Sequence, residues 1–222
     1  MVFACWSAKG GSGTTVVAVA LAVLFGREAD SCSVLVDLEG DGPTVFGTPE
    51  PKGPGLTDWL HASPSVGPAA LERLEQPVAK GVHLIPRGRR PLANEERAAS
   101  CCERLSIDDR TIVVDVGRVS GAGDSEDMVR RQFIAAASTS LLVIRPCFIS
   151  LRRALALPLR PTGVVLLEED GRALGRSDVE DILGVPVVAS VALDPAVARA
   201  VDSGLLASRL PTPLGKALRD VA

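Results

Sequence analysis

The sequence predicts an α/β fold with a mainly parallel seven-stranded sheet and helices on both faces. Short continuous apolar runs alternate with helical patterns along the whole chain, as they do in βαβ units. The chain has 222 residues, 46% of them apolar, which suffices for one such sheet and leaves little room for a second domain. We therefore expect a single domain over residues 1–222.

The first part of the chain contains four of the expected strands, each rich in Val, Ile or Leu. They are Val2–Ser7, Ser33–Asp37, Val82–Pro86 and Thr111–Asp115. The helices expected between them are Thr15–Arg27, Ala69–Leu74 and Ala93–Arg104. The apolar run in the first helix is about half the length of a bilayer span, so we interpret it as a buried helix. Residues 40–68 are rich in Gly and Pro and predict a long loop with one helical turn, a kind of connection that is more often functional than idle.

The second part continues the alternation to the end of the chain. The expected strands are Ser140–Arg145, Gly163–Leu167 and Val185–Val191. The expected helices are Ser125–Ala136, Ser150–Leu157, Ser177–Leu183 and Pro195–Val201, several opening after a residue that caps helices well. Continuous apolar strands of this kind are typical of a sheet that is covered on both faces.

Composition and charge exclude several classes of protein. The 24 basic and 27 acidic residues give a net charge of −3, and no basic run is dense enough to give a strong nucleic-acid signal. The five cysteines form no CxxC pair and the two histidines stand alone, which argues against a zinc site. No segment approaches the roughly 18 apolar residues of a membrane span, so we expect a cytoplasmic protein.

A glycine-rich loop carries the strongest functional signal. Lys9-Gly10-Gly11-Ser12-Gly13-Thr14-Thr15 lies directly between the first expected strand and the first expected helix. The glycines let backbone N–H groups converge on one point, and the helix N-terminus adds partial positive charge, so the loop suits a phosphate. Thr15 stands where a P-loop places its Mg²⁺-binding hydroxyl, although it also fits a simple helix cap. The lysine that normally precedes this Ser or Thr is replaced by Thr14.

The loop resembles the deviant Walker A pattern of the MinD/ParA ATPases, which begins with a lysine, here Lys9. The replacement at Thr14 is similar to the CpaE/TadZ branch of that family. Further segments extend the resemblance over nearly the whole chain: Val34–Glu39, Gly55–Leu60, Gly81–Pro86, Ile112–Asp115, Leu142–Arg153, Leu183–Val197 and Pro211–Ala222. The last of these resembles the closing helix of the family. The resemblance implies ATP and Mg²⁺ as ligands, and a homodimer in which Lys9 reaches the nucleotide of the partner subunit.

Acidic residues end two of the expected strands. Asp37 and Asp115 therefore lie at the C-terminal edge of the sheet, beside the loop, where an aspartate can hold Mg²⁺. The resemblance implies that Asp115 is the Walker B residue, that Asp37 supports the metal shell and that Glu39 stands where the family places the aspartate that orients water. Because a longer side chain disturbs that geometry and Thr14 replaces the phosphate lysine, we expect a weak ATPase at most.

The resemblance implies a nucleotide-dependent positioning protein for a Tad-type pilus or a septum. Such a protein would be recruited to a pole or septum by a protein partner of that assembly. Two alternatives remain at this point. A nucleotide-free scaffold is consistent with the replacement at Thr14, and a DNA-partitioning ATPase of the ParA type would need a basic surface and competent catalysis.

Overall fold

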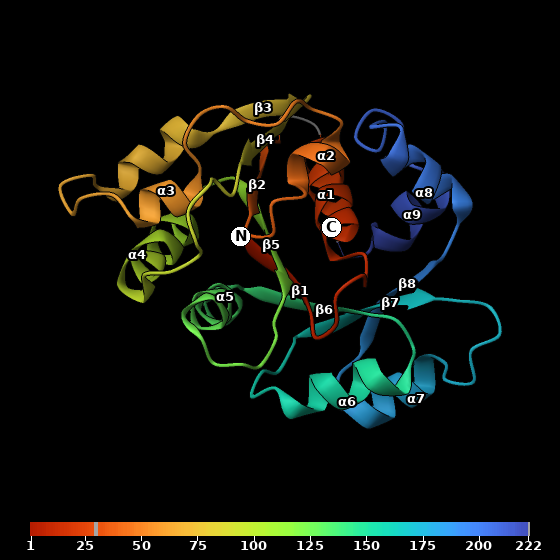
Figure 1. Cartoon of the computed structure of the whole chain (residues 1–222). Coiled ribbons are helices and arrows are strands. Elements are labelled where there is room, and N and C mark those ends of the chain that lie inside the picture. The colour runs from red at the N-terminus through yellow and green to blue at the C-terminus, as the bar shows by residue number, and fades with distance from the viewer. Residues whose placement is uncertain (29–30, 222) are drawn as a thin grey trace.

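The computed structural model describes residues 1–28 and 31–221, and its centre is one eight-stranded sheet (Figure 1). The strands are β1 (Val2–Ser7), β2 (Ser33–Asp37), β3 (Gln76–Ala79), β4 (Val82–Ile85), β5 (Thr111–Arg118), β6 (Thr139–Ile144), β7 (Gly163–Glu168) and β8 (Val187–Ala192). Their order is β3-β4-β2-β5-β1-β6-β7-β8, and every neighbouring pair except β3–β4 is parallel. Strand β1 therefore lies in the middle, with the loop that follows it at the C-terminal edge.

Helices cover both faces of this sheet. They are α1 (Thr14–Phe25), α2 (Gly42–Phe46), α3 (Leu56–Leu60), the 3₁₀-helix η1 (Pro68–Leu74), α4 (Glu95–Ser106), α5 (Ser125–Ala136), α6 (Phe148–Ala156), α7 (Arg176–Leu183), α8 (Pro195–Asp202) and α9 (Thr212–Leu218). Helices α1, α2, α8 and α9 gather on one side, and α3 to α7 lie on the other (Figure 1). The predicted α/β class with helices on both faces is confirmed.

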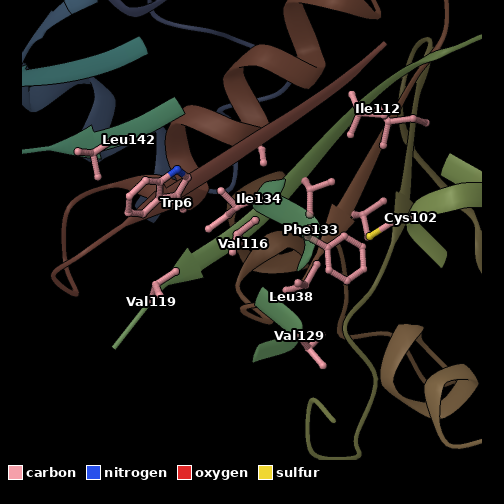
Figure 2. Close-up of a cluster of buried hydrophobic side chains, with 14 of the residues drawn as sticks. Trp6, Leu38, Cys102, Ile112, Val116, Val119, Val129, Phe133, Ile134 and Leu142 are labelled. Carbon is pink, nitrogen blue, oxygen red and sulfur yellow. The ribbon is translucent and has the colours of Figure 1, made fainter. Parts of the chain in front are cut away.

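Two hydrophobic cores result from this arrangement. Alternate residues of each buried strand point to opposite faces, so Phe3 and Cys5 pack under α1 while Ala4 and Trp6 pack under α5 and α6. Figure 2 shows the second core, where Trp6 lies near Ile134 and Phe133 of α5 packs close to Leu38. Figure 2 also places both Val116 and Val119 in this core, although they are three residues apart.

The predicted count of seven strands was wrong by one. The additional strand, β3, is a four-residue edge strand that pairs antiparallel with β4. It contains Pro77 and is only partly buried, so it lacks the apolar run by which the other strands are recognised. Proline is tolerated at a sheet edge because its missing N–H costs no ladder hydrogen bond there.

The loop predicted over residues 40–68 contains one helix more than expected. The helical turn at Leu56–Leu60 is present as α3, and α2 precedes it with Pro43 in its first turn. A helix of five residues has too few positions for an apolar period, so the sequence pattern does not reveal it. The closing helix appears as α9, and the last residue of the range Pro211–Ala222 lies outside the described residues. Within residues 1–28 and 31–221, no helix is both long and apolar enough to cross a bilayer.

Candidate functional site

The glycine-rich loop after β1 has a backbone shaped by two left-handed glycines. Gly11 has φ of 72° and Gly13, the N-cap of α1, has φ of 76°. A Cβ on Gly13 would also lie 2.9 Å from Cδ1 of Leu167. These positions therefore require glycine, and the resulting turn presents the N-terminus of a twelve-residue helix to the space above the loop.

Two hydroxyl groups hold the start of the loop in place. Ser12 Oγ donates a 2.6 Å hydrogen bond to the carbonyl of Lys9, and Ser7 Oγ donates a 3.1 Å bond to the same carbonyl. Thr14 is buried at the first turn of α1, while Gly10 and Gly11 are exposed to a ligand approaching from outside. The loop is thus ordered by its own bonds and open on its outer side.

Asp115 lies fully buried on β5, directly beside β1, where Cys5 is its register partner. Its Oδ1 accepts a 3.2 Å hydrogen bond from the backbone N–H of Gly117, whereas Oδ2 has no partner among the described residues. Burial raises the pKa of Asp115 to about 8, the nearby Asp37 carboxyl adds to the shift, and the Thr15 hydroxyl opposes it. A buried carboxylate oxygen without a partner, next to a threonine hydroxyl, is a donor set that fits Mg²⁺.

Asp37 is also buried, but its carboxylate is fully engaged with backbone. Oδ1 accepts hydrogen bonds from Glu39 at 2.9 Å and Gly40 at 2.7 Å, and Oδ2 accepts one from Gly42 at 2.9 Å. Burial raises the pKa of Asp37, and these three donors act in the opposite direction. The carboxylate thereby shapes the turn from β2 into α2 while lying close to Asp115.

Glu39 is held by an arginine from a distant part of the chain. Its Oε2 lies 2.8 Å from Nη1 of Arg130, which is buried on α5. Arg130 also pairs with Glu126 at 2.7 Å and donates to the carbonyl of Val116. The carboxylate of Glu39 still borders the space above the loop, since it lines the same cavity as Gly10 to Val16.

Two cavities meet at Gly13, and together they form the candidate site. The first, of about 410 Å³, is lined by the loop from Gly10 to Thr15, by Glu39 and Asp41, and by Arg118. The second, of about 590 Å³, has a largely apolar lining that includes Val16, Leu167, Val191, Leu193 and Val197. The first cavity is called the polar cavity because the loop backbone and three charged side chains, those of Glu39, Asp41 and Arg118, line it. A cavity of this kind beside a largely apolar one suits a ligand with a phosphate end and a flat, apolar end.

Sequence reasoning missed two arginines at this site. Arg118, the last residue of β5, lines the polar cavity, and Arg145, just after β6, lines the apolar one. Both stand at the C-terminal ends of strands that flank β1, so their presence at the edge near the loop follows from the strand order. Their positions after apolar strands were the available signal. The sequence does not show in which direction either arginine side chain points, so the structure was needed to place them at the cavities.

Lys9 lies at the outer end of the loop, close to the start of α6. Burial acts to raise the pKa of the Cys147 thiol, but hydrogen bonds with Ser150 and the charge of Lys9 outweigh it and lower that pKa. Beyond Cys147, Phe148 and Ile149 are 71% and 54% exposed. The structure therefore brings Lys9–Thr15, Asp37, Glu39 and Asp115 together at one edge, and it places Lys9 near Cys147, which precedes α6.

The family is identified by a match over most of the chain. Residues 3–207 match the model of the CobQ/CobB/MinD/ParA nucleotide binding domain. The chain belongs to this family. A search of curated proteins found no match.

Solved structures of the family share this fold at low sequence identity. A ParA family ATPase from Chlorobium tepidum TLS superposes with a TM-score of 0.77 at 20% identity, covering 99% of this chain and 96% of that chain. The septum site-determining protein MinD from Pyrococcus horikoshii OT3, solved with Mg-ADP, gives 0.77 at 17%, covering 99% and 93%. A variant of McdA from Cyanothece, solved as its ATP complex, gives 0.72 at 18%, covering 99% and 95%. These likenesses confirm the P-loop fold predicted from the sequence.

Proposed function

We propose that this chain is one P-loop domain over residues 1–222 that binds ATP with Mg²⁺ and works as a nucleotide-dependent positioning switch. The observation that carries the proposal is the pairing of the glycine cradle with the buried Oδ2 of Asp115, which has no partner among the residues that the structure describes. A cradle of this shape binds phosphate, and an unpartnered buried carboxylate oxygen is costly unless a ligand or cation uses it. Related proteins of the family have been solved with Mg-ADP and with ATP.

Each residue of the site has a role in this proposal. The backbone N–H groups of Gly10 to Thr15 would hold the phosphates, and the apolar cavity around Val16 and Leu167 would take the base. Thr15 and Asp115 would hold the metal, with Asp37 fixing the turn behind them. Mg²⁺ supplies charge neutralisation at the phosphates when it is bound.

Slow hydrolysis follows from two features of the same site. Thr14 offers no cation where the P-loop normally places a lysine, so charge that develops on the phosphates has one stabilising partner fewer. Glu39, the residue proposed to orient water, is drawn toward Arg130 at 2.8 Å. An ion pair with a buried arginine holds the carboxylate in place, so it is less free to turn toward a water molecule. Binding is therefore favoured over turnover, which is sufficient for a switch that shifts a population.

Dimerisation would link nucleotide binding to an output. Lys9 stands at the mouth of the loop, and the exposed Phe148 and Ile149 lie beyond its neighbour Cys147. A second copy seated on this face would cover the apolar side chains and bring its own phosphates to Lys9. The ammonium group then serves as a point charge on phosphate across the interface.

Within the family, we assign the chain to the CpaE/TadZ type. This part of the proposal rests on Thr14, which replaces the phosphate lysine, and on the lysine at position 9. A protein of this type would localise a pilus or septum assembly through a protein partner. A solved relative, MinD from Aquifex aeolicus, has been crystallised in complex with MinC, a cell division protein. We extend this type of partnership to the present chain as part of the proposal.

The test is the molecular mass of the wild-type chain and of Lys9→Ala, measured by light scattering with and without Mg-ATP. The wild type should rise to twice the monomer mass of 23.1 kDa with ATP, while Lys9→Ala keeps nucleotide binding and stays monomeric. Lys52→Ala, on the loop between α2 and α3, serves as the control and should behave as wild type. If ATP changes neither the mass nor the calorimetric signal of the wild type, the nucleotide-free scaffold is the better interpretation.

A further inference from the structure

A P-loop that lacks its lysine still needs a positive charge at the phosphates. An ATP molecule carries several negative charges, and backbone N–H groups alone supply only partial charges. In this chain the residue before Thr15 is Thr14, which is buried and neutral. In the structure, a positively charged side chain from another strand lies near the loop.

That cation is on β5, and a bulge in the strand determines where it points. Cys5 pairs with Asp115, but Trp6 pairs with Gly117 and Ser7 with Arg118, so β5 has one extra residue opposite β1. Gly117 supports the irregularity with φ of 70°. In a regular strand, residues three apart point to opposite faces, yet Val116 and Val119 lie in the same core (Figure 2).

The bulge therefore changes the face on which Arg118 lies. Without it, Arg118 would follow the alternation set by Val116 and point away from the face that carries α1. With it, Arg118 takes the same face as Asp115 and the glycine-rich loop. A Cβ built on Gly10 would lie 3.8 Å from Cδ of Arg118, so the outer part of the Arg118 side chain lies beside the loop.

The surroundings of Arg118 leave its charge available. The side chain is exposed and lines the polar cavity of about 410 Å³ together with Gly10 to Thr15. Within residues 1–28 and 31–221 it has neither an ion pair nor a side-chain hydrogen bond, whereas Arg130 nearby is held by Glu39 and Glu126. The planar guanidinium can donate two parallel hydrogen bonds to a phosphate.

We propose that Arg118 binds the terminal phosphates of the nucleotide and supplies the charge that Thr14 cannot. This inference rests on the proposed nucleotide binding and deepens it. Arg118 would contact only the phosphate end of the nucleotide, since the apolar cavity that would take the base lies on the other side of Gly13. The same charge would favour ATP over AMP, because only the former extends phosphates toward it.

The experiment is calorimetric titration of ATP, ADP and AMP into the wild type, Arg118→Ala and Arg118→Lys, each in Mg²⁺. Arg118→Ala should weaken ATP binding by about tenfold or more, the size expected for a lost charge-assisted hydrogen bond, and leave AMP binding unchanged. Arg118→Lys should recover part of the loss. Arg73→Ala, an exposed arginine on η1, is the matched control and should bind as wild type.

A double-mutant cycle separates a direct role from a structural one. If Arg118 and the missing lysine serve the same phosphates, Arg118→Ala should cost much less in a Thr14→Lys background than in the wild type. The assignment of Arg118 would be overturned if Arg118→Ala lowered the affinity for ATP equally in both backgrounds, or lowered the affinities for ATP and AMP equally. In either case, ATP binding by the wild type would still uphold the proposed function. Absence of ATP binding in the wild type would overturn both.

Discussion

Nη1 of Arg130 lies 2.8 Å from Oε2 of Glu39 and joins α5 to the turn that follows β2. The arginine is buried, and its other partners are Glu126 and the backbone carbonyls of Val116 and Leu38. Burial opposes the charge of Arg130, but Glu126 and Glu39 outweigh it and raise the pKa of the guanidinium. The interaction thus fixes Glu39 at the rim of the polar cavity.

Replacing Arg130 should destabilise the fold more than replacing Glu39. Arg130→Met removes a donor from the carbonyl of Val116 and the arginine partner of the partly buried Glu39 carboxylate, so we expect a loss of about 3 kcal/mol in the free energy of unfolding. Glu39→Gln keeps the shape and an acceptor, and should cost about 1 kcal/mol or less. Urea denaturation of both variants measures the difference. Equal losses would mean that Arg130 is not the centre of this network.

Thr14→Lys should tighten ATP binding by about tenfold, because it returns a full positive charge to the phosphates. Turnover should remain low in this variant, since the Glu39 carboxylate is still paired with Arg130. Adding Glu39→Asp shortens the side chain by one methylene and should raise phosphate release above that of Thr14→Lys alone. A coupled phosphate assay on the three proteins checks this order, and fast release by the wild type would contradict it.

The buried Asp115 should make stability depend on pH when Mg²⁺ is absent. Its pKa is about 8 in the folded chain against an ordinary value of 3.8, so the folded state binds its proton more tightly. The resulting stabilisation is complete below pH 3.8 and is lost as the pH rises through about 8. Relative to Asp115→Asn, the wild type should therefore lose stability between about pH 5 and pH 8, the upper part of that window. Denaturant titrations in the presence of a chelator measure the free energy of unfolding of both proteins. If the two free energies change with pH in the same way, the pKa of Asp115 is not raised by burial.

Gly47 should tolerate no side chain. Its φ is 73°, and a Cβ there would overlap the carbonyl of Gly204, where α2 meets the segment after α8. We expect Gly47→Ala to lower the free energy of unfolding by about 2 kcal/mol or more. Gly53→Ala is the control and should be neutral, because no atom of the described residues lies within 4 Å of a Cβ at that position. Thermal unfolding of both variants gives the comparison.

Much of the fold could be predicted because the information is local. The strands that end in Asp37 and Asp115 are continuous apolar runs, and parallel strands bring their ends to one edge. The glycines at 11 and 13 indicate the cradle directly, since only glycine adopts that backbone without strain. The edge strand β3 and the short α2 lack a period that a sequence pattern can reveal.

The rest of the site depends on contacts between distant segments. Arg130 reaches Glu39 from α5, and no spacing in the sequence relates the two. Arg118 required knowledge of the bulge, because one extra residue in β5 moves its side chain to the opposite face. The sequence pattern therefore predicted the residues whose position follows from the local backbone. It missed the residues whose side chains are placed by contacts between distant segments.

The most direct test of the account is a calorimetric titration of Mg-ATP into the wild type and Gly13→Ala. The wild type should bind one ATP per chain. Gly13→Ala should lose binding, because a Cβ there meets Leu167 at 2.9 Å and the position has φ of 76°. Gly123→Ala controls for backbone strain and should bind as wild type, because its φ is 71° and a Cβ there has no neighbour within 4 Å in the part of the chain that the structure describes. No heat of binding from the wild type, or full binding by Gly13→Ala, would contradict the account.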